Sequence, residues 1–336
     1  MSRETGHDTH GQLAARAALS GWRRVDADRV RSLGILLPFI ALFITLSVTS
    51  SAFLTKVNLL DILEQQSGTL IVAAAGTLVL VAGGLDLSVG AVYSLATVTS
   101  GHFAQSTPAW VAIVLGIGVG SLVGLANGLV VTVLRINALI TTLAMSFVVG
   151  GIAALATGGN IITLFNKPGF GALTQTEFIG VKTSIWVMLI PVLGLALLLS
   201  RAKAGRYIYA VGGNARAARL AGVRVDATRT MTFVLSGTAA GLAGVIDTSR
   251  VLSASASTQD TNTLAFTVLA GIVVGGTSIL GGDGAVWRTI VGILFIALIG
   301  NGYILLGLNV LYQQITLGVL LIVAVSLDVW TRRRRE

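Results

Sequence analysis

Ten stretches of predominantly apolar residues divide this chain, and each is close to the length of about 20 residues that a helix needs to cross a bilayer. Hydrophobic residues make up 54% of the 336 and charged residues only 11%, against about 25% in soluble domains. The sequence therefore predicts an all-α integral membrane protein with about ten transmembrane helices. The ten segments are residues 33–53, 60–82, 87–105, 109–134, 137–157, 184–200, 230–250, 263–281, 286–306 and 310–330.

The second and third segments are the hardest to delimit. They are joined only by Gly83-Gly84-Leu85-Asp86, so either of them can be short or broken. A similar polar and glycine-rich stretch at 275–284 follows the eighth segment. Interrupted helices in the two halves of a transporter point towards a substrate path.

Basic residues are unevenly distributed among the connecting segments. With both termini in the cytoplasm, 19 Lys and Arg lie inside and only Lys56, Lys167, Lys182 and Arg250 lie outside. This asymmetry is typical of cytoplasmic loops and predicts both termini on that side. It also accounts for the net charge of +9, so no nucleic-acid partner is expected, whereas anionic membrane lipid is.

The predicted organisation is one membrane domain with two tails. Residues 1–32 form a cytoplasmic N-terminal tail rather than a signal peptide, because charges run throughout them. Residues 33–330 form the transmembrane domain, with a basic cytoplasmic loop at 201–229, and residues 331–336 form a basic cytoplasmic C-terminal tail.

Glycines recur at i, i+4 spacing on several segments. Gly116, Gly120, Gly124 and Gly128 share one face of the fourth segment, where small residues let a neighbouring helix approach closely. The pairs Gly237 with Gly241 and Gly271 with Gly275 repeat the pattern. These positions predict helix packing rather than nucleotide binding.

A few polar residues lie within the apolar segments and need partners there. Asp86 is either a helix cap, accepting from the backbone of Ser88 or Val89, or a residue of a substrate path, and the two roles are compatible. Asn127, Asn137 and Asn301 are expected to bond to other helices or to face a cavity. Asp247 and Arg250 are spaced to pair on one helix face. The candidate residues of the translocation pathway are Asp86, Ser88, Asn127, Thr277, Ser278 and Asn301.

Motifs for chemistry are missing. There is no cysteine, and His7, His10 and His102 are more typical of solvated or interfacial positions than of a metal site. No phosphate-binding G-x-x-x-x-G-K-[ST] loop or hydrolase motif occurs. We therefore expect no catalytic site, no metal and no cofactor bound by this chain, and an uphill transporter of this kind must take its energy from a partner.

The basic loop contains a short helix signal. Asn214 is a good N-cap, Ala215 to Ala221 are mostly strong helix formers, and Gly222 supplies a stop, while Gly212-Gly213 is expected to break the chain before it. Ala217, Ala218 and Ala221 give this helix a slim surface that could enter a cleft on a partner protein. The alternative is an ordinary basic loop.

Three motifs resemble those of ribose-type ABC importer permeases, in the same order. They are Gly-Gly-Leu-Asp-Leu-Ser-Val-Gly at 83–90, Gly-Arg-Tyr-Ile-Tyr-Ala-Val-Gly-Gly-Asn at 205–214 with Ala-Arg-Leu-Ala-Gly-Val at 218–223, and Val-Gly-Gly-Thr-Ser-Ile-Leu-Gly-Gly at 274–282. The resemblance spans roughly residues 55–328.

This resemblance implies a multi-pass permease of the bacterial plasma (inner) membrane that imports a monosaccharide or related small polyol. It implies a second permease copy or close paralogue, an external sugar-binding protein, and a separate ABC ATPase that uses ATP and Mg. The ATPase-coupling residues would be Gly205, Arg206, Tyr207, Gly212, Gly213, Asn214, Ala217, Ala218, Arg219, Leu220 and Gly222. Two other functions are kept open, a stand-alone secondary carrier or channel for small polar solutes and a membrane scaffold.

Overall fold

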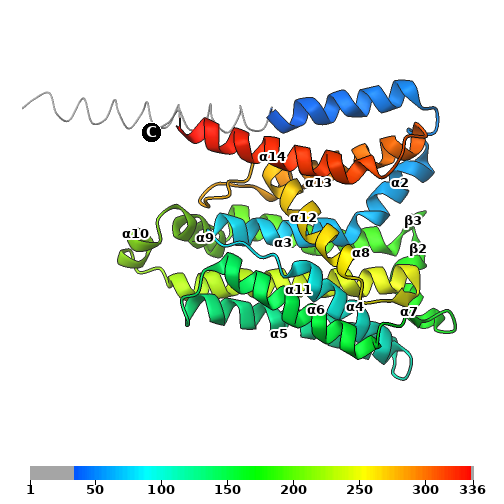
Figure 1. Ribbon diagram of the computed structural model, residues 1–336, viewed down its shortest axis with the longest axis horizontal. Coiled ribbons are helices and arrows are strands. Elements are labelled where there is room, and N and C mark those ends of the chain that lie inside the picture. Colours follow the sequence, from blue (N-terminus) through cyan, green and yellow to red (C-terminus); the bar gives the residue numbers. More distant parts are fainter. Residues whose placement is uncertain (1–33, 334–336) are drawn as a thin grey trace, which may run out of the picture.

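The computed structural model describes residues 34–333, so the predicted N-terminal tail, 1–32, lies outside the described part. Of the C-terminal tail predicted at 331–336, residues 331–333 continue α14 and residues 334–336 lie outside. Helices dominate the fold, and the axes of most of them are roughly aligned (Figure 1). The first half contains the helix Gly34–Thr49, α2 (Lys56–Gln65), α3 (Ser67–Val81), α4 (Val89–Ala104), α5 (Ala109–Thr132), α6 (Ala138–Thr157) and α7 (Pro168–Gln175). The second half contains α8 (Thr183–Arg201), α9 (Lys203–Gly213), α10 (Ala215–Leu220), α11 (Val225–Val251), α12 (Thr258–Val274), α13 (Val286–Leu305) and α14 (Tyr312–Arg333).

Each of the ten predicted apolar segments contains a helix. The second segment is broken, as the prediction allowed, and the end of the eighth was wrong. The segment 60–82 is divided between α2 and α3, with Gln66 between them. The segment 263–281 ends as a helix at Val274, because Gly276 adopts a φ of 79° that a right-handed helix does not allow. Within the described residues, the helices α5, α6, α8, α11 and α13 are long and apolar enough to cross a membrane.

Short strands are a small departure from an all-α fold. Between residues 34 and 333, four strands of two residues each occur in the connecting segments: β1 (Ile162–Thr163), β2 (Glu177–Phe178), β3 (Val181–Lys182) and β4 (Ser253–Ala254). The strands β1 and β4 pair antiparallel, with Ile162 opposite Ala254, and β2 and β3 form a hairpin. They fasten loops at one end of the bundle.

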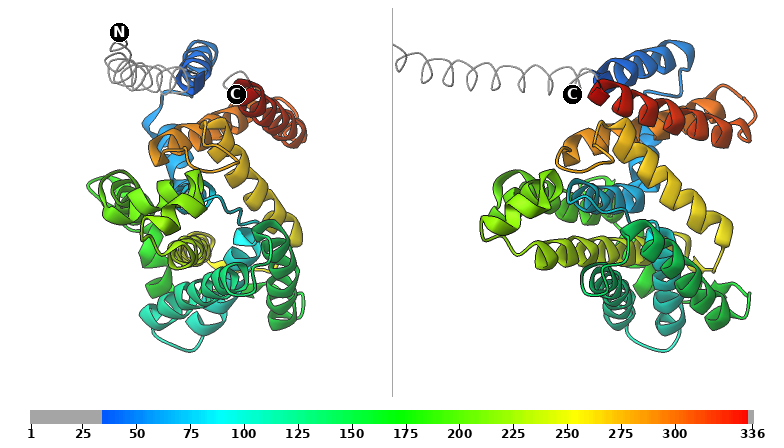
Figure 2. Two further views of the ribbon diagram at one scale, coloured as in Figure 1. Left: turned by 90° about the vertical axis from the view of Figure 1, so that its left-hand side faces the viewer. Right: turned by 60° about the vertical axis from the view of Figure 1, so that its left-hand side comes forward.

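The core is built around α3, which is buried along almost its whole length. It packs against α8, α11, α12 and α13, whose ends are seen around it in Figure 2. A run of small residues, Ala73 to Ala75, allows this crowding. The hydroxyl of Thr77 lies 2.7 Å from that of Thr289 in α13, so its polar group is satisfied inside the bundle.

The predicted glycine groove of the fourth segment is confirmed as the contact between α5 and α11. A Cβ atom on Gly124 would lie 3.1 Å from the Cα of Gly237, and one on Gly237 would lie 2.8 Å from the Cα of Gly124. Gly120 faces Gly237 and Gly241 in the same way. The two glycine series therefore pack into each other, and any side chain there would push the backbones apart.

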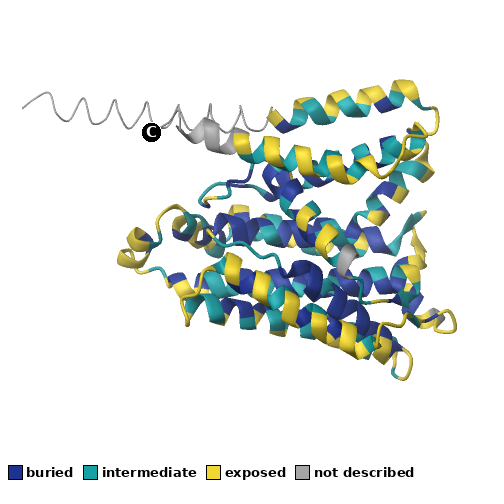
Figure 3. Cartoon of the chain, in the orientation of Figure 1, coloured by how far each residue is buried: buried dark blue, intermediate teal, exposed yellow. Residues whose placement is uncertain are grey.

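Many residues on the outer faces of the bundle are exposed (Figure 3), and large apolar side chains are common among them. Phe147 and Leu155 of α6 are more than four-fifths exposed, and Leu122 of α5 and Ile190 of α8 are mostly exposed. Such a belt is unsuited to water and suited to lipid.

The two ends of the bundle differ. Helices α9 and α10 lie at one end, together with the end of α14, whereas α7 and the β2–β3 hairpin lie at the other (Figure 1). Lys182, predicted to be outside, belongs to that second end, where its amine is 2.7 Å from the carboxylate of Glu64.

Candidate functional site

Helix α10 and its two caps follow the local prediction. The Asn214 carboxamide oxygen accepts a hydrogen bond of 2.9 Å from the Ala217 N–H. At the other end Gly222 has a φ of 83°, its N–H bonds to Arg219 O, and the Val223 N–H bonds to Ala218 O. These two bonds form a Schellman motif, which satisfies the last carbonyls of the helix. A helix this short depends on such caps.

The expected break at Gly212-Gly213 was wrong. Both glycines belong to α9, and the chain turns at Asn214, whose φ of −157° is extended. Glycine lowers the stability of a helix without preventing it. The packing explains Gly212 instead, because a Cβ atom there would meet Val81 O and would lie 2.7 Å from Gly282 N.

The exposed face of α10 differs from the predicted one. Ala218 is buried with Val211 and Val225, so it anchors the helix to this chain rather than facing a partner. Ala217 is exposed and Leu220 is 85% exposed. We define the α10 face as Ala217, Leu220 and Ala221, which are all exposed.

The other predicted coupling residues lie around this short helix. Arg219 pairs with Asp226 at 3.2 Å, and both side chains are largely exposed. Gly205 is buried at the turn from α8 to α9, where a Cβ atom would clash with the carbonyls of Leu198 and Leu199. Arg206 and Tyr207 are exposed.

Segments from the three sequence motifs meet at one place, which we call the glycine junction and define as Gly83, Gly212, Gly281 and Gly282. The Gly282 N–H donates a hydrogen bond of 2.8 Å to Val81 O, at the end of α3. A Cβ atom on Gly281 would lie 2.9 Å from the Cα of Gly83, and one on Gly282 would lie 2.9 Å from the Cα of Gly213. Backbone thus packs on backbone between the end of α3, the end of α9 and the loop after α12.

Further bonds hold that loop. The Tyr209 hydroxyl of α9 donates to Gly284 O at 2.6 Å. Asp283 pairs at 3.0 Å with Arg288, whose side chain is almost fully buried. Of the predicted pathway residues, Thr277 and Ser278 are buried within this loop, and Ser278 N–H bonds to Asp283 O.

Three of the predicted pathway residues, Asp86, Ser88 and Asn127, form a second group at the start of α4, which we call the Asp86 cluster. One carboxylate oxygen of Asp86 accepts from the Ser88 N–H at 3.0 Å and from the Ser88 hydroxyl at 2.6 Å. The other accepts from the Ser236 hydroxyl of α11 at 2.7 Å. Asn127 of α5 donates to the Ser88 hydroxyl at 2.7 Å. The predicted bond from the Ser88 N–H to the Asp86 carboxylate is therefore present, although the N-cap residue of α4 is Ser88 itself. Ser236 is a partner that sequence reasoning missed.

The remaining polar residues have separate positions. Asn301 exchanges hydrogen bonds with Asn58, the shorter being 2.7 Å, as expected for a bond between helices. Asn137 is exposed and caps α6 by accepting from the Leu139 N–H, so the expected bond to another helix was wrong. Asp247 and Arg250 form the predicted ion pair, at 2.5 Å.

Sequence reasoning also missed a cavity of about 450 Å³ between α3, α12, α13 and α14. The six predicted pathway residues are absent from its lining. It is lined in part by Thr263 and Thr267, which are spaced i, i+4 at the start of an apolar helix. That spacing places two hydroxyls on one face and is the signal that could have found it.

Comparison with known proteins agrees with this architecture. Residues 58–325 match the family described as "Branched-chain amino acid transport system / permease component", which covers more than half of the chain. The chain is 35% identical over 309 residues to the ribose import permease protein RbsC of Bacillus subtilis, covering 91% of this chain and 95% of that protein. It is 36% identical over 302 residues to the RbsC protein of Escherichia coli K12, covering 89% and 92%. It is 34% identical over 331 residues to the L-arabinose ABC transporter permease protein AraH of Azospirillum brasilense, covering 96% and 93%. No solved structure matches.

The chain therefore belongs to this family of transport permeases. It is a multi-pass protein of the plasma (inner) membrane and the membrane subunit of an ABC transporter, in which the ATPase is a separate subunit.

Proposed function

We propose that this chain is the permease subunit of an ATP-driven importer for a monosaccharide or related small polyol. Two copies, or this chain and a close paralogue, form the pathway, and an external sugar-binding protein delivers the substrate. A partner ATPase binds ATP and Mg and docks on the α10 face. The chain crosses the membrane about ten times, with both tails, 1–32 and 331–336, in the cytoplasm.

One observation supports the coupling role above all others. The α10 face presents an exposed Leu220, while the same helix is anchored through Ala218 and follows directly after α9. Helix α9 in turn contacts the end of α3 and the loop after α12 at the glycine junction. A displacement of α10 would therefore be transmitted to the two interrupted segments, after α3 and after α12, through backbone contacts rather than through flexible side chains.

The names of the relatives support a sugar as substrate, since two are ribose import permeases and a third is an arabinose permease. The predicted pathway residues Asp86 and Ser88 follow shortly after Gly83 of the glycine junction, and Asn127 bonds to Ser88. Movement of the junction would alter this cluster, which makes it a candidate gate.

The first test is reconstitution. The chain is co-expressed with its candidate ATPase and sugar-binding protein, and the complex is placed in liposomes. We expect sugar uptake that requires ATP and is stimulated by the loaded binding protein. Uptake by the purified chain alone, driven by an ion gradient, would instead favour a secondary carrier.

The second test concerns the docking face. Ala217→Asp places a charge on the exposed face and is expected to abolish sugar-stimulated ATP hydrolysis while membrane insertion and folding persist. Ala218→Asp is the matched comparison, because its charge would be buried against Val211 and would lower the yield of folded protein. Normal stimulation in Ala217→Asp would remove the docking assignment.

A further inference from the structure

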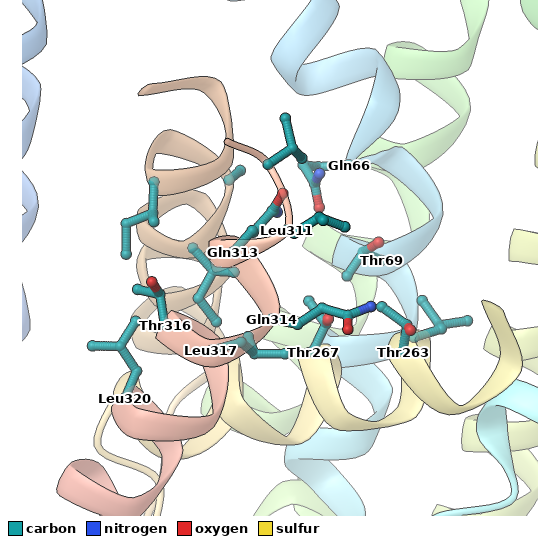
Figure 4. Close-up of a pocket in the computed structure, with 15 residues that line it drawn as sticks. Gln66, Thr69, Thr263, Thr267, Leu311, Gln313, Gln314, Thr316, Leu317 and Leu320 are labelled. Carbon is teal, nitrogen blue, oxygen red and sulfur yellow. The ribbon is translucent and has the colours of Figure 1, made fainter. Parts of the chain in front are cut away.

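The cavity between α3, α12, α13 and α14 has the dimensions of a small-molecule site. Its volume of about 450 Å³ lies within the range of roughly 300–1,000 Å³ that is usual for such sites. Figure 4 shows polar side chains from three different helices converging on it, including Thr69 of α3, Thr267 of α12 and Gln314 of α14. The remaining wall is apolar, formed by residues such as Leu264 and Leu317.

The polar groups of the lining are all uncharged. They are three carboxamides and four hydroxyls, those of Gln66, Gln313, Gln314, Thr69, Thr263, Thr267 and Thr316. Each carboxamide offers two donors and an acceptor, and a hydroxyl offers both functions. The Thr316 hydroxyl already bonds to Tyr303 and to Tyr312 O, so the hydroxyls of Thr69 and Thr267 are the ones that a ligand can use. Sugar hydroxyls also donate and accept, so this set complements a polyol rather than an ion.

The carboxamides are available for a ligand. Within the described residues, the side chains of Gln66, Gln313 and Gln314 make no hydrogen bond to the rest of the chain. Amide groups among apolar helices need such partners, which only water or a bound polar molecule can supply here. Gln66 and Gln313 are half-buried, whereas Gln314 is exposed. Two half-buried carboxamides without a protein partner beside one cavity indicate a polar occupant.

A charged solute such as an amino acid is a poor occupant of the same cavity. The lining contains no Asp, Glu, Lys or Arg to neutralise it. The start of α14 could have bound a carboxylate, but its first N–H groups are already used. Those of Leu311 and Tyr312 bond to Asn309, and that of Gln313 bonds to Val310 O. A zwitterion would therefore lose hydration without compensation.

The position of the cavity fits entry from outside. It is bordered by Gln66, which separates α2 from α3, and by Val310 and Leu311, which precede α14. In the topology proposed above, the segments before α3 and before α14 both lie on the external side. An interrupted helix beside a ligand site is a recurrent feature of transporters.

We propose that this cavity is a binding site for an uncharged monosaccharide within a single permease chain, in the outer half of the membrane. The inference rests on the proposed function as a sugar importer. It adds that the permease itself distinguishes neutral polyols from charged solutes, and that the sugar is held between helices of one copy before it reaches the Asp86 cluster.

The test uses the absence of cysteine from this sequence. Thr267→Cys and Gln314→Cys place single thiols in the cavity, from α12 and α14, in the otherwise complete transporter. Ser106→Cys is the control, at an exposed position between α4 and α5. Labelling by a maleimide is followed with D-ribose, L-arabinose or L-leucine present. We expect one of the sugars to slow labelling of both cavity thiols about tenfold or more at saturation, since a site that is nine-tenths filled leaves one-tenth free. Leucine should protect neither, and Ser106→Cys should label equally in all conditions.

Three results would overturn the proposal: labelling of both cavity thiols that no sugar slows, failure of the reagent to reach either thiol, or protection by leucine as strong as by sugar.

A transport measurement separates failure of the cavity assignment from failure of the proposed function. Thr267→Val, which removes one hydroxyl at nearly constant volume, should lower the affinity for transported sugar roughly three- to tenfold, the size of one neutral hydrogen bond. If the wild-type complex imports sugar while Thr267→Val and Gln314→Leu leave uptake unchanged, only the cavity assignment fails. If the wild-type complex imports no sugar, the proposed function fails.

Discussion

Glycine has different structural roles in two glycine-rich regions of this protein. In the α5–α11 contact, glycines at i, i+4 spacing let two long straight helices touch along their length. In the glycine junction, four glycines from three separate parts of the chain bring together two loops and a helix end. The first arrangement is a regular interface between rigid bodies. The second is a set of local backbone contacts, and three of its four glycines have positive φ: Gly83, Gly281 and Gly282.

The difference indicates that one region is a rigid scaffold and the other can move. Helices that interlock along several turns form a scaffold, because separating them exposes every contact at once. A junction of loops can shift at one point without unpacking the bundle. The Asp86 cluster connects the two regions, because it joins the start of α4 to Asn127 of α5 and Ser236 of α11.

The largest expected effect is at the scaffold. Gly120→Leu would force a side chain into Gly237 and Gly241, and we expect a loss of about 3 kcal/mol or more in stability, seen as little folded protein on size-exclusion chromatography in detergent. Gly118→Leu is the matched control, since nothing lies within 4 Å of a Cβ atom there and the new side chain faces outwards. Equal yields of the two variants would contradict the assignment of the α5–α11 contact as a scaffold.

A smaller effect on stability and a larger one on coupling are expected at the junction. Gly212→Ala would push Val81 and Gly282 away from α9, at a cost of about 1–3 kcal/mol. We expect the folded transporter to be recovered, with sugar-stimulated ATP hydrolysis reduced to its unstimulated rate. Gly213→Ala, where a Cβ atom meets nothing within 4 Å, should retain stimulation. Normal coupling in Gly212→Ala would show that the junction is only structural.

The connection between the regions can be weakened by itself. Ser236→Ala removes one donor from the partly buried Asp86 carboxylate, and the loss of a partner for a buried polar group costs about 1–3 kcal/mol. We expect a lower melting temperature and slower sugar uptake. Ser146→Ala in α6, whose hydroxyl bonds only within its own helix, should change neither. If Ser236→Ala melted and transported as the wild type does, the cluster would be uninvolved in either region.

The smallest expected effect is at the periphery of α10. Asp226→Asn breaks the exposed ion pair with Arg219, and such pairs contribute about 0–1 kcal/mol. We expect unchanged coupling and a melting temperature within a few degrees of wild type, since α10 is held by its caps and by Ala218. A loss of coupling as large as that expected for Gly212→Ala would move the critical contact from the junction to this pair.

Much of the architecture was predictable because lipid imposes simple rules on sequence. Apolar segments of sufficient length located the helices, the i, i+4 glycines located the α5–α11 contact, and Asn214 with Gly222 located both ends of α10. These signals are local, and they depend on helix geometry alone. The position of the break in the segment 60–82 was not predictable in detail, since Gln66 is not itself a helix-breaking residue and Gly68 lies within α3.

Tertiary structure decided what these local features do together. Ala217 and Ala218 are identical residues one step apart, yet one is exposed and the other is buried against Val211, because only the packing of α10 on α9 selects a face. The convergence of Gly83, Gly212 and Gly281 depends on contacts between residues more than 60 positions apart, about which spacing along the chain says nothing. The sequence by itself determined the solvent of this protein and the positions of its helices, through hydrophobicity, charge and helical period. Only the fold determined which polar groups share a cavity and which backbones touch.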